Sequence, residues 1–195
     1  MHPIISKNIG LQALFYLIVV VISSCSHSNN SKDSNKTFFK EISGIESGLL
    51  FANNITENDS LTYFKFPYIY MGSGVAIGDV NNDGLSDVFF TGNMVDNKLY
   101  LNKGNMHFED ISIPAGIQGD QRWYTGVTMN DINNDGFLDI YVSVSGKYDD
   151  TRNQLFINNG DLTFTEKAND FGIDDDSNSI QSTFFDYDND GDIDL

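Results

Sequence analysis

Short apolar runs separated by polar, glycine-containing turns fill the chain from residue 74 onward. One set of runs precedes an acidic stretch, at residues 74–78, 126–130 and 182–185, and a second set follows the first two stretches, at residues 88–91 and 140–144. Runs this short, rich in β-branched and aromatic residues, are typical of strands. No helical periodicity is found outside an apolar segment near the N-terminus, so the pattern predicts an all-β chain.

Two further strands are expected after each of these pairs. Residues 97–104 match residues 153–160, and both copies end in a glycine. The second copy closes with Asn159-Gly160, a dipeptide typical of hairpin turns. The strands that follow are expected to begin near residues 107 and 163. The pattern therefore predicts four short antiparallel strands in each unit.

One acidic phrase of nine residues, D-x-[ND]-x-D-G-x-x-D, marks each unit. Its copies occupy residues 79–87, 131–139 and 186–194, and they begin 52 and 55 residues apart. Four-stranded units of this length are typical of β-propeller blades, with the phrase in the turn between the first two strands. Because the third unit stops at Leu195, we predict a partial β-propeller. Its remaining blades would come from further C-terminal sequence or from a partner chain.

The phrase also predicts a metal site. It places oxygen-bearing side chains at positions 1, 3, 5 and 9, which suits calcium and its roughly six to eight oxygen ligands. Glycine at position 6 allows a sharp turn, so that the carbonyl of position 7 can also point inward. We therefore predict Ca²⁺ as the cofactor. In an intact propeller the third phrase, which has the most acids, is expected to bind it most tightly, whereas in this chain the third loop lacks the following strand and is expected to be loose. The predicted side-chain ligands are Asp79, Asn81, Asp83, Asp87, Asp131, Asn133, Asp135, Asp139, Asp186, Asp188, Asp190 and Asp194, and the predicted carbonyl ligands are Leu85, Phe137 and Asp192.

The phrase has two alternative interpretations. An EF-hand loop needs a glutamate at position 12 and helices on both sides. Position 12 is Phe90 in the first copy and Val142 in the second, and the flanking residues predict strands. The EF-hand is therefore rejected. A polar turn without metal stays open, although three copies in phase with the strands make it the weaker interpretation.

The N-terminal region predicts export. An apolar run at residues 11–22 follows Lys7 and precedes the single cysteine of the chain, Cys25. A run of about a dozen apolar residues is typical of a secretory signal and too short for a membrane span. Residues 22–25, Ile-Ser-Ser-Cys, resemble the lipobox of bacterial lipoproteins, which implies that Cys25 is acylated. An ordinary signal peptide with a chance cysteine is the alternative.

These features divide the chain into three parts. We predict a lipoprotein signal peptide at residues 1–24, a flexible polar tether at 25–37 and a repeat region at 38–195. The lipid would be the only attachment to a membrane, on the cell surface or facing the periplasm.

The charge and the histidines limit the possible functions. The formal net charge is −17, from 28 acidic and 11 basic residues, and so strong a negative charge disfavours binding to nucleic acid. The three histidines lie in the predicted signal, the tether and a turn, with no partner nucleophile. No catalytic residue is predicted, although sequence alone leaves open a pair of acids in a cleft.

The repeats resemble a known family. Residues 72–79 and 99–102, together with the acidic phrase, resemble the FG-GAP/VCBS repeats of integrin α-subunit propellers and of secreted bacterial proteins. The resemblance covers about residues 38–195 and is closest to bacterial VCBS-repeat lipoproteins, some of which also carry an ASPIC/UnbV domain. It implies calcium in each loop and a surface role in binding or adhesion, with a protein or glycan as ligand. A structural envelope module without a ligand and a non-catalytic part of a larger secreted enzyme are the alternatives.

Three further segments carry expectations. The aromatic run at residues 63–70 is expected to form a strand with one buried face rather than a recognition surface. Trp123 is expected to pack in the core rather than to contact a ligand. Residues 39–49 resemble the ends of both later units, so they are expected to form a fourth strand that closes the last blade of the ring.

Overall fold

The computed structural model describes residues 39–120, 122–146, 150–191 and 193–195. The chain separates into two units, residues 1–41 and 42–195, and the second unit contains every element described below. The predicted signal peptide, tether and Cys25 lie outside the described residues.

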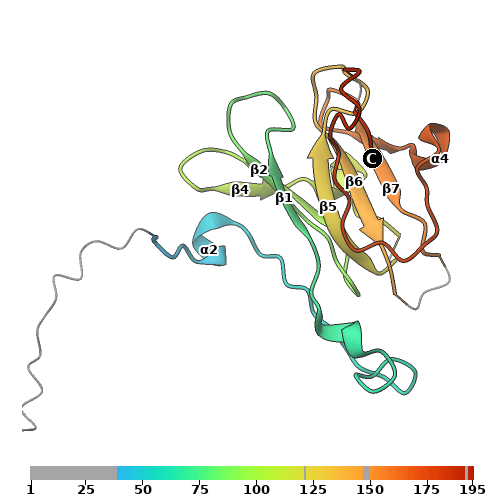
Figure 1. Cartoon of the computed structure of the whole chain (residues 1–195). Helices are drawn as coiled ribbons and strands as arrows, with labels where there is room; N and C mark the ends of the chain where they lie inside the picture. The colour runs from blue at the N-terminus through green and yellow to red at the C-terminus, as the bar shows by residue number, and fades with distance from the viewer. Residues whose placement is uncertain (1–38, 121, 147–149, 192) are drawn as a thin grey trace, which may run out of the picture. The chain divides into compact units, whose positions relative to one another are not determined.

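The eight strands form two four-stranded sheets. Each sheet is an antiparallel meander in which neighbouring strands follow one another along the chain (Figure 1). The first sheet contains β1 (Val75–Gly78), β2 (Asp87–Phe90), β3 (Lys98–Asn102) and β4 (Phe108–Asp110). The second contains β5 (Tyr124–Asn130), β6 (Asp139–Val144), β7 (Gln154–Asn158) and β8 (Phe164–Glu166). The prediction of four short strands per unit is confirmed.

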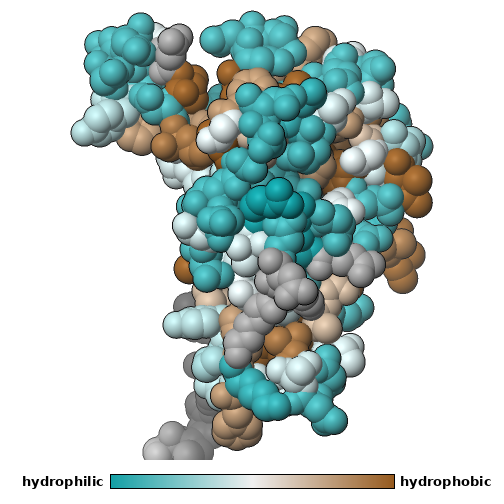
Figure 2. Space-filling view, turned by 90° about the vertical axis from the view of Figure 1, so that its right-hand side faces the viewer, coloured by the Kyte–Doolittle hydropathy of each residue, from teal (hydrophilic) through white to brown (hydrophobic). Residues whose placement is uncertain are grey.

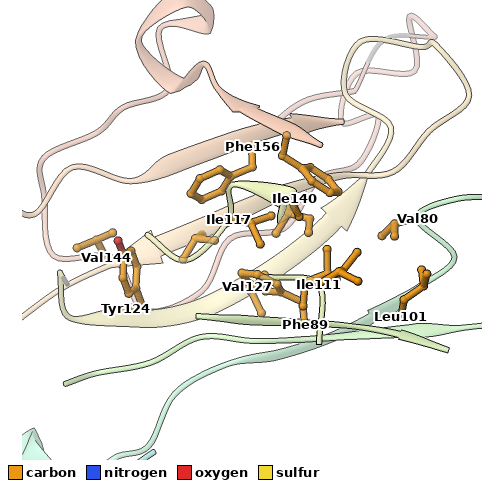
Figure 3. Packing of buried hydrophobic residues seen from close by; sticks show 14 residues of the cluster. Val80, Phe89, Leu101, Ile111, Ile117, Tyr124, Val127, Ile140, Val144 and Phe156 are labelled. Carbon is orange, nitrogen blue, oxygen red and sulfur yellow. The ribbon is translucent and has the colours of Figure 1, made fainter. Parts of the chain in front are cut away.

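The two sheets pack against each other as consecutive blades of a partial β-propeller. Side chains from both sheets point toward one another in the space between them (Figure 3). Phe89 and Leu99 come from the first sheet, and Val127, Ile140 and Phe156 from the second. Burying one such side chain stabilises the fold by about 1.5–3 kcal/mol. The main hydrophobic core thus lies between the blades and belongs to both.

Single helical turns occur where the sequence predicts no helix. α2 (Gly44–Ser47), α3 (Ser112–Ala115) and α4 (Ala168–Phe171) each end at a glycine with a left-handed backbone. One turn is too short to produce a helical period in the sequence. The expectation of a strand at residues 39–49 is wrong, because these residues contain α2 and otherwise form no regular element. The Ser43 hydroxyl instead caps α2 by accepting from the Glu46 N–H at 3.1 Å.

The aromatic run also differs from its expected structure. Residues 63–70 form turns and the 3₁₀-helix η1 (Pro67–Tyr70) instead of a strand. Proline has no N–H to donate and fixes φ, which suits the first turn of a helix better than a sheet. Phe66 and Ile69, three residues apart, are buried against Trp123, whereas Tyr68 is exposed. The expectation that Trp123 packs in the core is confirmed, since its side chain is only 3% exposed.

The third unit runs beside β5. The Gly126 N–H donates to the Ile180 carbonyl at 2.8 Å, and the Thr128 hydroxyl donates to the Ser182 carbonyl at 2.6 Å. The strand expected just before the third phrase is reduced to a single bridge between Phe185 and Asp194.

The surface of the described region is mainly polar on the side seen in Figure 2, where hydrophobic residues form small separate groups. Within the described ranges, no helix combines the length and the apolar character that crossing a membrane requires.

Candidate metal loops

The three acidic phrases form loops with the same backbone conformation. In the first two copies, the loop joins the first and second strands of a blade, as predicted. Positions 4 and 6 both have positive φ in every copy. The angles are 58° at Asn82, 58° at Asn134 and 64° at Asn189, and 85° at Gly84, 91° at Gly136 and 96° at Gly191. The asparagine at position 4 was not singled out from the sequence, although it is identical in all three copies and asparagine tolerates this conformation better than most residues.

The aspartate at position 1 holds the turn closed. The Asp79 carboxylate accepts hydrogen bonds from the N–H groups of Asp83 at 3.1 Å and of Gly84 at 2.7 Å. Asp131 accepts the same pair of bonds at 3.0 and 2.8 Å, and Asp186 accepts them at 3.1 and 3.1 Å. This side chain therefore stabilises the same turn in all three loops.

Positions 3 and 5 are linked to each other in the first two loops. Asn81 Oδ1 accepts from the Asp83 N–H at 3.2 Å, and Asn81 Nδ2 donates to Asp83 Oδ2 at 3.0 Å. Asn133 and Asp135 make the same two bonds. The oxygens suit a hard cation, but the bond between amide and carboxylate would have to be replaced when the cation binds.

The aspartate at position 9 is buried beneath the loop. Asp87 accepts from the N–H groups of Val80 at 2.9 Å and of Asn102 on β3 at 2.8 Å. Burial raises the pKa of Asp87, and the nearby carboxylates add to this effect, while the two N–H donors oppose it. Asp139 has equivalent partners, and burial likewise raises its pKa. A cation beside such a carboxylate would offset the cost of burying its charge.

The third loop gathers the most carboxylates. Oxygens of Asp186, Asp188 and Asp194 lie within 4.8 Å of one another, and no other group of this kind occurs in the described part of the chain. Asp194 is exposed and accepts from the Tyr187 N–H at 2.8 Å. The all-oxygen donor set fits a hard cation such as Ca²⁺. Asp192, predicted to ligate by its carbonyl, lies outside the described residues.

Hydrogen bonds connect the first loop to the second blade. Asn82 Nδ2 donates to the Gly136 carbonyl at 2.9 Å, so the first two loops are in direct contact at one end of the blades (Figure 1). The buried Asn158 at the end of β7 donates through Nδ2 to the Val80 carbonyl at 2.8 Å and to the Leu138 carbonyl at 3.2 Å. Sequence reasoning noted the repeat that contains Asn158 but missed this bracing role.

Two consecutive four-stranded blades, each with an acidic loop after its first strand, define a β-propeller repeat protein. Residues 79–142 match the FG-GAP-like repeat, and this match extends from the first loop into β6 of the second blade. The matched segment, from the first loop to β6, is thus similar to FG-GAP-like repeats.

Similar proteins include integrin alpha-8 and cartilage acidic protein 1 of vertebrates. The chain is 32% identical to integrin alpha-8 of Gallus gallus over 128 residues, which cover 58% of this chain and 12% of the relative. It is 30% identical to cartilage acidic protein 1 of Xenopus tropicalis over 98 residues, which cover 50% of this chain and 14% of the relative. Cartilage acidic protein 1 of Homo sapiens is 25% identical over 121 residues, which cover 62% of this chain and 18% of the relative. The chain thus spans less than a fifth of the length of these relatives.

Proposed function

We propose that this chain is an exported FG-GAP repeat module whose acidic loops bind Ca²⁺ and whose blades bind a protein partner. The observation that carries the proposal is the shared conformation of the three loops, each with positive φ at positions 4 and 6 and with its first carboxylate turned onto the same two N–H groups. Because the same loop geometry occurs three times in one chain, we infer that the three loops bind the same ligand.

The bound cation would supply positive charge among carboxylates that otherwise repel one another. In each loop the side chains of positions 1, 3, 5 and 9 and the carbonyl of position 7 would hold it. Because positions 1 and 9 are already fixed by backbone N–H groups, the loops need little ordering before a cation binds. Among the three, the third loop would bind most tightly because it has the most carboxylates.

A binding role outside the cell fits the sequence and its relatives. The signal-like residues 1–24 and the lipobox-like Cys25 support export and anchoring by lipid, with residues 25–37 as a tether. The integrin and cartilage acidic protein relatives support an interaction role in preference to catalysis. In this proposal further blades complete the ring, which would cover Val75 and Ile77 of β1, now 56% and 67% exposed.

Calorimetric titration of the chain with calcium chloride tests the metal part of the proposal. We expect binding of two or more ions and a higher unfolding temperature in calcium than in chelator, measured by circular dichroism. The matched control carries Asp→Asn at position 1 of every loop, at Asp79, Asp131 and Asp186, and should lose the heat of binding. A folded β protein that shows neither heat nor a change in unfolding temperature would contradict the proposal. The loops would then be turns only.

Mass spectrometry of the protein expressed in a bacterium that processes lipoproteins tests the anchor. We expect cleavage before Cys25 and the added mass of acyl chains, and Cys25→Ser should abolish both. An unmodified Cys25 in an exported protein would leave an ordinary signal peptide as the interpretation.

A further inference from the structure

A hollow of about 670 Å³ lies at the end of the blades opposite the acidic loops. Its lining includes Trp123 at the start of β5 and Gly146 just after β6, whereas the second loop joins the other ends of these two strands. Residues 65–74, which form one wall, lie at the lower end of Figure 1, and the loops lie at the upper end. The volume is within the range of about 300–1,000 Å³ that ligand pockets have.

Four segments that are distant in the sequence line the hollow. The segment around η1 forms one wall, and the beginning of β5, the turn after β6 and residues 178–181 of the third unit line the rest. The rings of Phe66 and Trp123 pack edge to face with centroids 5.2 Å apart, which fixes the first wall on the second blade. The hollow therefore has a defined shape set by the packed core.

The exposed part of the lining includes three large apolar side chains. Tyr68, Met71 and Ile180 are 62%, 60% and 62% exposed, a large fraction for apolar side chains gathered around one depression. Clusters of this kind are typical of interaction sites. A ligand that covered these three side chains would gain most of its binding free energy from apolar contact.

Most polar groups of the lining already have partners within the chain. The Thr125 hydroxyl donates to the carbonyls of Ser143 and Ser179, and the Ser145 hydroxyl donates to Asn178 Oδ1. Gln181 Nε2 donates to the Thr128 hydroxyl and to a backbone carbonyl. Glycans need many unsatisfied donors and acceptors, so this lining favours apolar side chains over sugar rings.

The charge of the lining is unusual for this protein. Among the described residues, none of the lining side chains is acidic, and Lys65 is the one charged group, although the whole chain carries 28 acidic residues. Carboxylates are thus kept away from the hollow, where they would disfavour apolar contact. The net charge of −17 would at the same time attract a partner that is basic around its apolar contact residues.

We propose that the hollow binds a short extended peptide segment of a protein partner, through two or three large apolar side chains flanked by lysine or arginine. The inference rests on the proposed binding function and gives that function a site and a ligand class. The side chains of the segment would contact Tyr68, Met71 and Ile180, with the ring of Trp123 beneath them.

Fluorescence of Trp123 provides a direct test, because it is the only tryptophan in the chain. The probes are synthetic peptides with a Leu-Phe-Leu core between pairs of lysines, the same peptides with a Gly-Ser-Gly core, and chitotetraose and cellotetraose as sugars. We expect a saturable change in emission with the Leu-Phe-Leu peptide and at least tenfold weaker binding of the Gly-Ser-Gly peptide. Replacing the lysines by glutamates should also weaken binding, and added salt should reduce this difference.

Single substitutions then locate the site. Ile180→Ser and Met71→Ser should each weaken binding of the Leu-Phe-Leu peptide about tenfold, since both side chains are exposed and neither supports the core. Ile113→Ser is the matched control, because Ile113 is 70% exposed on α3 and is not part of the hollow. It should bind the peptide as the unaltered chain does.

Three kinds of positive response would overturn the inference. They are equal binding of both peptide cores, equal loss of affinity in the Ile113→Ser control, and an emission change with a sugar but not with the apolar peptide. Absence of any response to the Leu-Phe-Leu peptide would also overturn it. Calcium titration of the same samples separates this failure from that of the proposed function. Retained calcium binding would leave the loops intact, whereas loss of both would remove the basis of both proposals.

Discussion

Asp87 is both a predicted metal ligand and a buried structural brace. Its two carboxylate oxygens accept N–H groups from Val80 and Asn102, and one of these bonds joins the loop to β3. An asparagine at this position keeps one acceptor and places an amide N–H₂ beside a backbone donor. We therefore expect Asp87→Asn to lower the free energy of unfolding by about 1–3 kcal/mol even in chelator, measured by urea unfolding.

Asp188 provides the matched comparison for this prediction. It is exposed within the carboxylate group of the third loop, and asparagine already stands at this position in the other two loops. Asp188→Asn should leave stability in chelator unchanged while it weakens calcium binding. If both variants lost stability equally in chelator, the distinction between brace and ligand would be wrong.

Asn158 differs from its counterpart Asn102 in what it connects. Both side chains donate to a carbonyl beneath their own loop, but the Asn158 amide also donates to the Val80 carbonyl of the first blade. Asn158 is buried, whereas Asn102 is partly exposed. Thermal or urea unfolding should show a loss of about 2–3 kcal/mol for Asn158→Ala and about 1 kcal/mol for Asn102→Ala. Equal losses would mean that the bond between the blades contributes nothing.

Asp150 makes the stability of the fold depend on pH in the acidic range. Its hydrogen bond from Arg152 lowers the pKa of Asp150 to about 2, and Arg122 adds to this effect. Since an unfolded aspartate has a pKa of about 3.9, this stabilisation is complete above that value and is lost as the pH falls through about 2. The carboxylate is partly exposed, so solvent screening limits the effect to less than about 1 kcal/mol.

The variant Asp150→Asn tests this effect. Its unfolding temperature in chelator should lie below that of the unaltered chain at pH 7, and the two should converge between about pH 4 and pH 2. Asp176→Asn, which alters an exposed acid, should follow the unaltered chain throughout. A difference that persists unchanged at about pH 2 would contradict the assignment.

At the scale of elements, the entrance to the first strand depends on a glycine. A Cβ added to Gly74 would lie 2.5 Å from the Thr125 carbonyl oxygen and 2.9 Å from the Val127 nitrogen, both of them backbone atoms of the second blade. The blades would have to move apart, so we expect Gly74→Ala to cost about 1–3 kcal/mol in urea unfolding. Ser73→Ala adds no atom beside β5 and should have little effect. A neutral Gly74→Ala would show that the blades can separate freely here.

Strands and loops whose sequence pattern is repeated in the chain were predicted correctly, whereas elements whose pattern occurs once were missed. The strands and loops were predicted correctly because residues 79–87 and their neighbours recur in phase. η1 was missed because the pattern of residues 63–70 occurs once and is compatible with both a strand and a helical turn. Single-turn helices such as α3 leave no periodic signal, and α2 formed where a strand was expected.

The candidate sites were predictable only where one segment contains all their residues. Each acidic loop is continuous, so its candidate ligands could be predicted from spacing alone. The hollow combines Met71, Trp123 and Ile180, which only the folded arrangement brings together. The contact from Asn158 to Val80 likewise joins residues of different blades, and no pattern within one blade could have indicated it.

At the scale of the whole molecule, the position of the core determines how the blades unfold. The fully buried side chain of Ile140 comes from the second blade and packs in the same cluster as Phe89 of the first. Since the blades share this core and their loops are hydrogen-bonded together, neither blade should unfold by itself. Ile140→Ala should therefore cost about 2–5 kcal/mol and shift the unfolding of both blades equally.

Two spectroscopic probes can show whether the two blades unfold in one transition or in two. Trp123 fluorescence reports the start of β5 and its contact with η1, whereas far-ultraviolet circular dichroism reports all eight strands. The two curves should coincide in the unaltered chain and in Ile140→Ala, with and without calcium, because any bound calcium would stabilise a fold that the blades share. Curves that separate only in chelator would show that cation binding, and not the shared core, couples the blades. The loops would then control the assembly of the propeller as well as its stability.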